Sequence, residues 1–209
     1  TVIARGRSDL TLLTAAHCLS AEDVGRQITL RRGEQVVQTR VLAVARNPSY
    51  GTTPQGEVPG ADNALALVRL LEPEQPPTIW KELAPASISL DILPDPDGET
   101  LPIVSIDQFE KLHAVRAGNY SNPRWLEWGN AYRPIPGDSG SGVFVLRRQE
   151  NGTIQPILIG VVTDRSQLGG GGSVISRRHA WIAQALRPAP AGTDPSETTE
   201  SGTSEANRR

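Results

Sequence analysis

Several residue types are scarce in this chain, and each scarcity narrows the class of protein. Among 209 residues there is one cysteine, no methionine, and few aromatics: two Phe, three Tyr and four Trp. One cysteine cannot form an internal disulfide, so the fold must hold without one. The formal net charge is only −2, which indicates neither a nucleic-acid nor a membrane partner. No apolar run is long enough to cross a bilayer.

The missing methionine extends to position 1, where the chain begins with "TVIARGRSDLTLL". This stretch already has the pattern of a strand. We therefore expect that an N-terminal piece was removed or not included. Any signal peptide would have been lost with it, so composition alone leaves the compartment unknown.

What the chain has in quantity is turn residues, with 20 Gly and 17 Pro. They separate short apolar segments, which is typical of an all-β protein rather than a helix bundle. "VVQTRVLAV" and "GVFVLRR" are rich in β-branched residues, and "PILIGVVT" reads as a strand buried on both faces. One helix is expected at the C-terminal side, in "SRRHAWIAQAL", where Ser176 can cap it.

The pattern predicts two β-rich halves, at about 1–75 and 100–175, joined by a Pro- and Asp-rich crossing over 73–98. Together they form one expected domain over residues 1–187. Residues 188–209 contain no aromatic or large aliphatic residue. Such a segment cannot bury a core, and we expect a disordered polar tail or linker.

A serine between glycines stands in "PIPGDSGSGVF", residues 134–144. Glycine allows backbone conformations that a residue with a Cβ rarely adopts. Successive N–H groups can then turn toward one point, as an oxyanion hole requires. Ser139 is therefore a candidate nucleophile, although the motif alone is also compatible with an ordinary tight turn between strands.

A nucleophilic serine needs a base, and the base needs a carboxylate that fixes its tautomer. The candidate base is His17 in "TLLTAAHCLS", and the candidate acid is Asp62 in "GADNALALVRLLEP". The chain order His, Asp, Ser is one of three known orders for such a triad. Cys18 is the rival nucleophile, but adjacent residues at a strand end point to opposite sides.

These motifs, in this order, resemble the chymotrypsin/trypsin-like serine peptidases. "LTAAHC" is similar to the segment around the catalytic histidine of that family, "VLAVARNPSYG" to the segment before its acid, and "GDSGSG" to its nucleophile motif. "IGVVT" and "SRRHAWIAQAL" resemble the following strand and the C-terminal helix. The resemblance runs to about Leu186 and implies two six-stranded antiparallel β-barrel lobes, the first incomplete at its N-terminus.

The resemblance implies a serine endopeptidase that hydrolyses a polypeptide substrate through an acyl-enzyme, with no metal and no cofactor. His17, Asp62 and Ser139 would form the triad, and the N–H groups of Gly137 and Ser139 the oxyanion hole. Asp138 would be a buried structural acid, whose partner in cleavage-activated members is a new N-terminal amine. Cys18 would pair with a cysteine upstream of this chain or be a small buried residue. The resemblance also favours a secreted or periplasmic location.

The acid is open between two alignments. Spacing from His17 favours Asp62, whereas the strand residues of "ALALVRLLEP" fit better when Ala64 takes the place of the acid. Residues two apart in a strand point to the same side, so a bulge could still aim Asp62 at His17. With Ala64 there, the protein would be a weakened peptidase or an inactive protease-like binding or scaffold domain.

The resemblance places the substrate pocket at Arg133, at Thr163 to Arg165, and at Gly172. A buried Arg133 would favour an acidic side chain before the cleaved bond, unless it is turned outward. The remaining histidines, His113 and His179, stand among charged residues and are expected to be solvated at the surface. Three scattered histidines and one cysteine lack the spacing of metal ligands.

Overall fold

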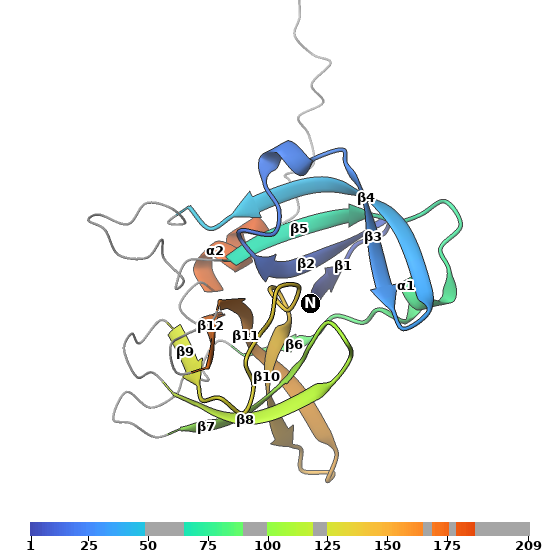
Figure 1. Cartoon of the computed structure of the whole chain (residues 1–209). Coiled ribbons are helices and arrows are strands. Elements are labelled where there is room, and N and C mark those ends of the chain that lie inside the picture. The colour runs from blue at the N-terminus through green and yellow to red at the C-terminus, as the bar shows by residue number, and fades with distance from the viewer. Residues whose placement is uncertain (49–64, 90–99, 119–124, 165–168, 176–178, 187–209) are drawn as a thin grey trace, which may run out of the picture.

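The computed structural model describes residues 1–48, 65–89, 100–118, 125–164, 169–175 and 179–186. In these residues the chain forms two mainly antiparallel β-sheets with two short α-helices and one 3-10 turn. The sheets lie one above the other in Figure 1, the first half of the chain in the upper sheet and the second half in the lower. The predicted all-β, chymotrypsin-like fold class is confirmed.

The first sheet has the strand order β1-β2-β5-β4-β3. Its strands are β1 (Val2–Arg5), β2 (Asp9–Ala15), β3 (Gln27–Arg32), β4 (Gln35–Arg46) and β5 (Leu65–Leu71), with the 3-10 turn η1 (Ala21–Asp23) after β2. All of its pairs are antiparallel. The described residues thus supply five strands to this lobe, where the resemblance implied six.

The core of the first lobe lies under β2, β4 and β5. Leu10, Val41, Val68 and Leu70 are almost fully buried there. The predicted crossing contributes to this core, because α1 (Thr78–Glu82) places Trp80 in it at 0% exposure. The Pro- and Asp-rich segment is therefore more than a connection, since its single helical turn closes one end of the first lobe.

The second sheet is a closed barrel. Its order is β10-β7-β8-β9-β12-β11, and a further pairing of β10 with β11 closes the ring of six strands. The strands are β7 (Leu101–Ile106), β8 (Leu112–Gly118), β9 (Trp125–Trp128), β10 (Gly142–Arg148), β11 (Ile154–Asp164) and β12 (Gly170–Val174). A short strand, β6 (Ser87–Ile88), pairs in parallel with β11 outside the ring. The central part of β11 is buried on both faces, as "PILIGVVT" predicted.

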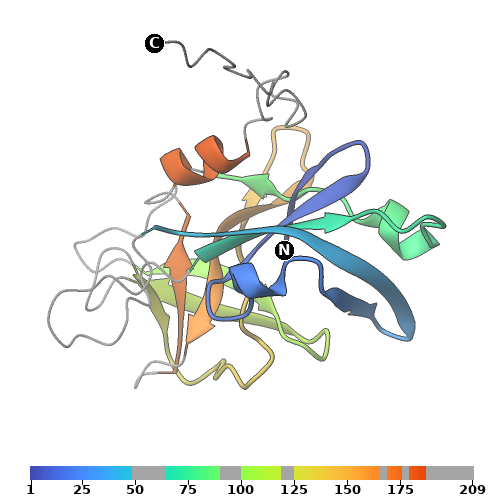
Figure 2. The same cartoon turned by 90° about the horizontal axis from the view of Figure 1, so that it is seen from above.

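A shared apolar cluster, here called the seam core, joins the two lobes. From the first sheet it takes Ile3, Leu13, Leu65 and Leu67, and from the second Leu158, Val161 and Ile175. The predicted C-terminal helix is α2 (His179–Ala185), which adds Ile182. Figure 2 shows α2 beside β6, at the edge where the two lobes meet. Neither helix has the length and hydropathy that a bilayer span would need within the described residues.

Candidate active site

His17 lies in the turn formed by residues 16–18, directly after β2; we call it the His17 turn. Pairing with β5 holds the strand up to Ala15, which lies opposite Leu65. The carbonyl of Ala15 then accepts a hydrogen bond from the amide of Cys18 at 3.0 Å. His17 is exposed, so the turn presents its imidazole at the surface on a well-paired strand end.

Ser139 lies in the loop of residues 134–141 that leads into β10; we call it the Ser139 turn. Gly137 has φ +105° and Gly140 has φ +88°, both in the region that favours glycine. A Cβ on Gly140 would also overlap with the Thr14 hydroxyl. The expectation that the glycines around Ser139 adopt conformations closed to other residues is thus confirmed at both positions.

The backbone amides of the Ser139 turn divide into two groups. Most donate hydrogen bonds to acceptors within the protein, namely those of Ile135, Asp138, Gly140 and Ser141. The amides of Gly137 and Ser139 have no acceptor in the part of the chain that the structure describes. These two unpaired amides alternate with paired ones on either side of the Asp138 residue. They are the same two that the resemblance assigns to an oxyanion hole.

The His17 turn and the Ser139 turn come together between the two lobes. Gly140 packs against Thr14 and Ala15 at the end of β2. On the other side, the amide of Gly140 donates to Val162 of β11 at 2.8 Å. The Cys18 sulfur lies 3.8 Å from the carbonyl oxygen of Ser139. Two motifs separated by most of the chain therefore share one surface.

Cys18 is a free, exposed cysteine, so the expectation that it is a small buried residue is wrong. The packing around its sulfur nevertheless raises the pKa of the thiol, and a hydrogen bond with Thr14 offsets only part of that effect. A thiol must lose its proton to act as a nucleophile, and a raised pKa keeps it protonated near neutral pH. Cys18 thus lacks the activation that a catalytic thiol requires.

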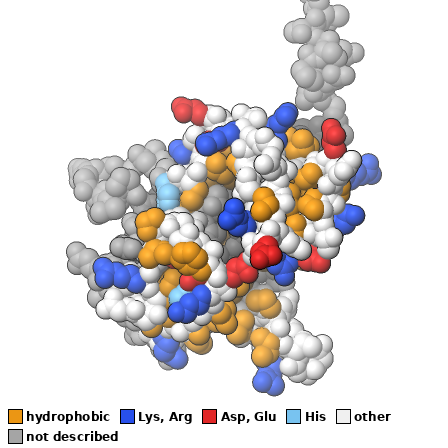
Figure 3. Space-filling view, turned by 45° about the vertical axis from the view of Figure 1, so that its right-hand side comes forward, with side chains coloured by type: hydrophobic (Ala, Val, Ile, Leu, Met, Phe, Trp, Pro, Cys, Tyr) orange, Lys and Arg blue, Asp and Glu red, His pale blue; other side chains and the backbone are white. Residues whose placement is uncertain are grey.

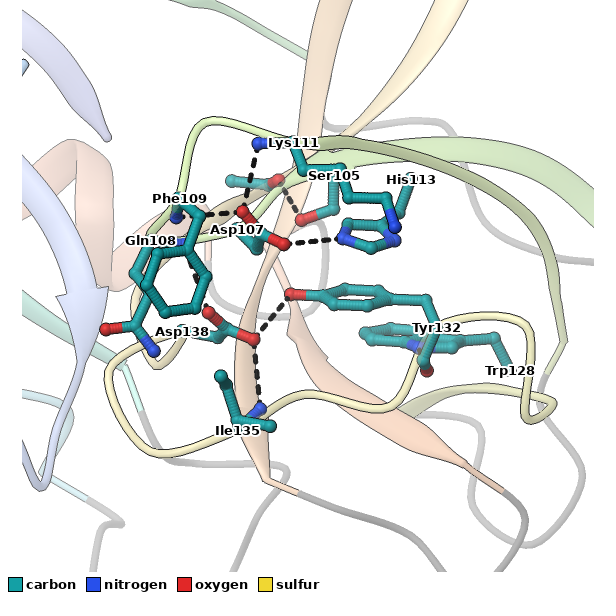
Figure 4. Close-up of polar contacts among 11 residues, drawn as sticks. Ser105, Asp107, Gln108, Phe109, Lys111, His113, Trp128, Tyr132, Ile135 and Asp138 are labelled. Carbon is teal, nitrogen blue, oxygen red and sulfur yellow. Dashed lines mark hydrogen bonds and ion pairs between the residues drawn. The ribbon is translucent and has the colours of Figure 1, made fainter. Parts of the chain in front are cut away.

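The carboxylate of Asp138 is buried at 1% exposure and accepts three hydrogen bonds (Figure 4). The amide of Gln108 donates to Oδ1 at 3.1 Å. The amide of Ile135 and the hydroxyl of Tyr132 donate to Oδ2 at 2.9 and 3.3 Å. All three donors are neutral. Because Asp138 lies between Gly137 and Ser139, these bonds fix the backbone on both sides of the residue.

The β7–β8 hairpin covers the Ser139 turn. Its Gln108 side chain donates from Nε2 to the carbonyl of Pro136 at 2.7 Å and fills the space that a Cβ on Gly137 would need. The same hairpin exposes apolar side chains on its outer side, with Phe109 71% exposed and Leu112 60% exposed. Figure 3 shows apolar side chains reaching the surface of the lower lobe among Lys and Arg.

Behind Asp138, three rings stack in parallel layers (Figure 4). The ring centroids of His113 and Tyr132 are 4.1 Å apart, and those of Tyr132 and Trp128 are 5.9 Å apart. The Trp128 indole N–H also donates to the Tyr132 carbonyl at 2.9 Å. His113 Nε2 pairs with Asp107 Oδ2 at 2.8 Å. Asp107 in turn accepts bonds from two backbone amides, of Phe109 and Lys111.

The prediction of a solvated His113 is wrong, because its side chain is only 13% exposed. The sequence did hold a signal for the pair. Asp107 directly follows β7 and His113 lies in β8 opposite Ser105, so the hairpin register brings Asp107 diagonally close to His113. Tyr132 carried no motif, and only the folded loop reveals its role. His179 opens α2, but its side chain lies outside the described residues.

This network shifts two pKa values in opposite directions. Burial raises the pKa of Tyr132, and the neighbouring Asp138 carboxylate raises it further. The hydrogen bond from His113 lowers the pKa of Asp107, helped by the amides of Lys111 and Phe109. At neutral pH Tyr132 therefore remains a hydrogen-bond donor, and Asp107 remains an acceptor.

The predicted pocket residues that the structure describes differ in their exposure. Gly172 of β12 pairs with Val162 of β11, next to Thr163, and both Gly172 and Thr163 are buried. The Thr163 hydroxyl has no hydrogen-bond partner among the described residues. Arg133 is exposed, so of the two orientations considered for it the outward one is found. Arg165 lies outside the described residues.

The candidate acid cannot be placed, because Asp62 and the alternative Ala64 both lie in the span 49–64, outside the described residues. The described strand begins at Leu65, one residue later. Within the residues that the structure describes, no group of three or more His, Cys, Asp or Glu side chains is arranged to hold a metal ion.

Comparison with solved structures gives a likeness of fold. The chain is similar to kallikrein-related peptidase 10 in complex with Zn²⁺, with a TM-score of 0.54 and 16% identity, over 87% of this chain and 86% of that one. At this identity the likeness concerns the fold alone. No family model matches the chain.

Comparison with curated sequences gives a partial match to an enzyme of a different class. A stretch of 141 residues is 33% identical to a methionyl-tRNA formyltransferase of Pseudomonas putida (strain W619). The match covers 65% of this chain and 45% of the formyltransferase. The chain thus spans less than half the length of the curated relative that it matches.

Proposed function

We propose that the chain is a serine endopeptidase, with Ser139 as the nucleophile and His17 as the general base. One observation carries the proposal most directly. In the Ser139 turn, the amides of Gly137 and Ser139 have no acceptor among the described residues, whereas their neighbours are paired. Two unpaired donors, one of them the amide of the serine itself, are what an acyl-transfer site needs for a developing oxyanion.

In the proposed reaction, His17 removes the proton from the Ser139 hydroxyl as its oxygen attacks the peptide carbonyl. The carbonyl oxygen becomes negative and accepts hydrogen bonds from the two unpaired amides. His17 then gives its proton to the departing amine, which leaves an ester on Ser139. In the second half, His17 takes a proton from water, the hydroxide attacks the ester, and the proton returns to Ser139 as the acid product leaves.

Asp62 is proposed as the carboxylate that orients His17. We also propose that residues 1–187 form the peptidase domain, and that Arg133, Thr163, Arg165 and Gly172 contact the substrate. We propose that the buried Thr163 hydroxyl favours a polar side chain before the cleaved bond, and that an acidic one is preferred if the exposed Arg133 turns toward the substrate on binding. Faster cleavage of a peptide panel after Glu and Asp than after Arg, Lys or aromatic residues would support that preference, and the reverse order would reject it.

The direct test is labelling with a fluorophosphonate, which reacts with an activated serine hydroxyl. The wild-type protein is expected to bind one equivalent at Ser139, and Ser139→Ala to bind none. Cys18→Ser is the matched control, since it alters the other candidate nucleophile, and it should label like the wild type. Asp62→Asn is expected to label far more slowly, because loss of a triad acid reduces turnover by about 10⁴.

The competing function is a protease-like binding or scaffold domain, which would keep the fold without turnover. Correctly folded wild-type protein that does not react with the fluorophosphonate would establish that alternative. Formyl transfer, suggested by the partial match to a methionyl-tRNA formyltransferase, is not supported by any contact described at the site. A formyltransferase assay on the same preparation separates it from both.

A further inference from the structure

The residue between the two unpaired amides, Asp138, controls the shape of the Ser139 turn. Its carboxylate oxygens hold two other backbone segments, at Gln108 and Ile135, at fixed distances of 3.1 and 2.9 Å. Rotation of the Gly137 or Ser139 peptide would pull this buried carboxylate away from its donors. An unpaired buried carboxylate is strongly unfavourable, so the donors favour one conformation of the turn.

Among the described residues, Tyr132 is the one side chain that donates to Asp138, because the other two donors are backbone amides. The Tyr132 ring has little freedom to move. His113 lies on one face, Trp128 lies against the other, and the Trp128 indole bonds the Tyr132 backbone. His113 is itself held by Asp107. The result is a continuous chain of contacts from the β7–β8 hairpin to the residue before Ser139.

We propose that Tyr132, held between His113 and Trp128, is a positioning residue that keeps the Gly137 and Ser139 amides in their donating orientation through Asp138. In this arrangement the side-chain partner of the Asp138 carboxylate is a neutral hydroxyl. This inference rests on the proposed peptidase function. It adds the claim that side chains of the second barrel fix the conformation of the Ser139 turn.

The experiment measures fluorophosphonate inactivation as two constants, the rate constant kinact and the concentration KI. Tyr132→Phe keeps the ring and removes one hydrogen bond to a carboxylate. We expect kinact to fall by about tenfold to a hundredfold, the factor that a hydrogen bond to a charged group is worth. KI should change little, because the bond orients the amides that act on the reacting oxyanion and does not itself contact the probe. Thr39→Val is the matched control: it removes the buried hydroxyl that bonds Leu71 in the first lobe, and should leave kinact unchanged. Wild-type kinact in Tyr132→Phe would overturn the proposal.

Two variants at His113 test whether the stacking of its ring on Tyr132 supports the Ser139 turn. His113→Phe keeps an aromatic ring against Tyr132, whereas His113→Ala removes it. We expect His113→Ala to lower kinact by about fivefold and His113→Phe to restore most of that loss, since a stacked aromatic pair contributes about 1 kcal/mol. Equal losses in both variants would overturn the role of the ring. If Tyr132→Phe does not fold, these two His113 variants test the positioning role of Tyr132 in its place.

Hydrogen exchange separates failure of this inference from failure of the proposed function. If the folded wild type does not react with the fluorophosphonate, the peptidase proposal fails, and the positioning claim is then judged on amide exchange in residues 135–141. Faster exchange at Asp138 and Gly140 in Tyr132→Phe, with no change in Thr39→Val, supports the positioning role. Unchanged exchange in Tyr132→Phe overturns it.

Discussion

The two turns that meet between the lobes are held in very different ways. The His17 turn is short and exposed, with one backbone hydrogen bond from Cys18 to Ala15. The Ser139 turn is held by Asp138, by Gln108 and by Val162 of the neighbouring strand. The first turn has only to present a side chain, whereas the second must also present backbone donors. A site that uses its own peptide groups needs the backbone itself fixed.

The largest effect is expected when a side chain is forced into the Ser139 turn. Gly140→Ala adds a Cβ at φ +88° that overlaps with the Thr14 hydroxyl. We expect a loss of about 3 kcal/mol in the free energy of unfolding, from backbone strain and overpacking together. Urea unfolding measures the loss, and fluorophosphonate labelling should stop.

The matched control is Gly152→Ala, at φ +82° with nothing within 4 Å of the added Cβ. This variant measures the strain of a positive φ alone, so we expect the free energy of unfolding to fall by about 1 kcal/mol. Equal losses at the two glycines would mean that the contact with Thr14 does not restrict the Ser139 turn.

The next largest effect is expected at the carboxylate within the turn. Asp138→Asn replaces one acceptor oxygen by an NH₂ group that faces backbone donors. We expect a loss of about 2 kcal/mol in unfolding free energy and slower labelling. Glu82→Gln removes an exposed acid paired with Arg32 at 3.3 Å and should change stability by less than about 0.5 kcal/mol. Similar stabilities of the two variants would show that the buried bonds to Asp138 contribute little.

A smaller, pH-dependent effect on stability is expected at Asp107, which contacts His113 and not the Ser139 turn itself. Its pKa is lowered in the folded state, first by the bond from His113. A carboxyl with a lowered folded pKa stabilises the protein above the unfolded pKa of about 3.9, and this contribution is lost as pH falls through the folded pKa. Asp107→Asn should therefore unfold at lower urea than the wild type near neutral pH. The two urea midpoints should converge in acid, and parallel curves across pH would contradict the assignment.

The smallest effect is expected at the His17 turn. Cys18→Ser keeps the size of the side chain and changes only a weak contact with the Ser139 carbonyl at 3.8 Å. Labelling rate and urea midpoint should both match the wild type. A large loss of labelling in this variant, with Ser139 still present, would return the thiol to the role of nucleophile.

The contrast between the turns also explains what the sequence could predict. Strand patterns such as "PILIGVVT" and the glycines beside Ser139 are local signals, because burial on both faces and positive φ leave their mark within a few residues. The meeting of the two turns followed from resemblance rather than from spacing. His17 and Ser139 belong to different sheets, and no local rule sets their separation.

The supports of the Ser139 turn were the part that sequence reasoning missed. His113 was predicted at the surface from its charged neighbours, yet the hairpin buries it against Tyr132. Tyr132 has no motif because its role depends on a ring from β8 and a carboxylate six residues ahead in the loop. Such networks depend on long-range packing, which a pattern of residue types does not contain. The acid, Asp62 or Ala64, stays a prediction.

The seam core has a consequence for how the protein is made. It combines Ile3 and Leu13, near the beginning of the chain, with Ile175 and Ile182, near the end of the described part. During synthesis the first lobe leaves the ribosome long before its apolar partners exist. The seam core is complete only when α2 has been made, so the peptidase activity proposed above should be absent from nascent chains and arise late in folding.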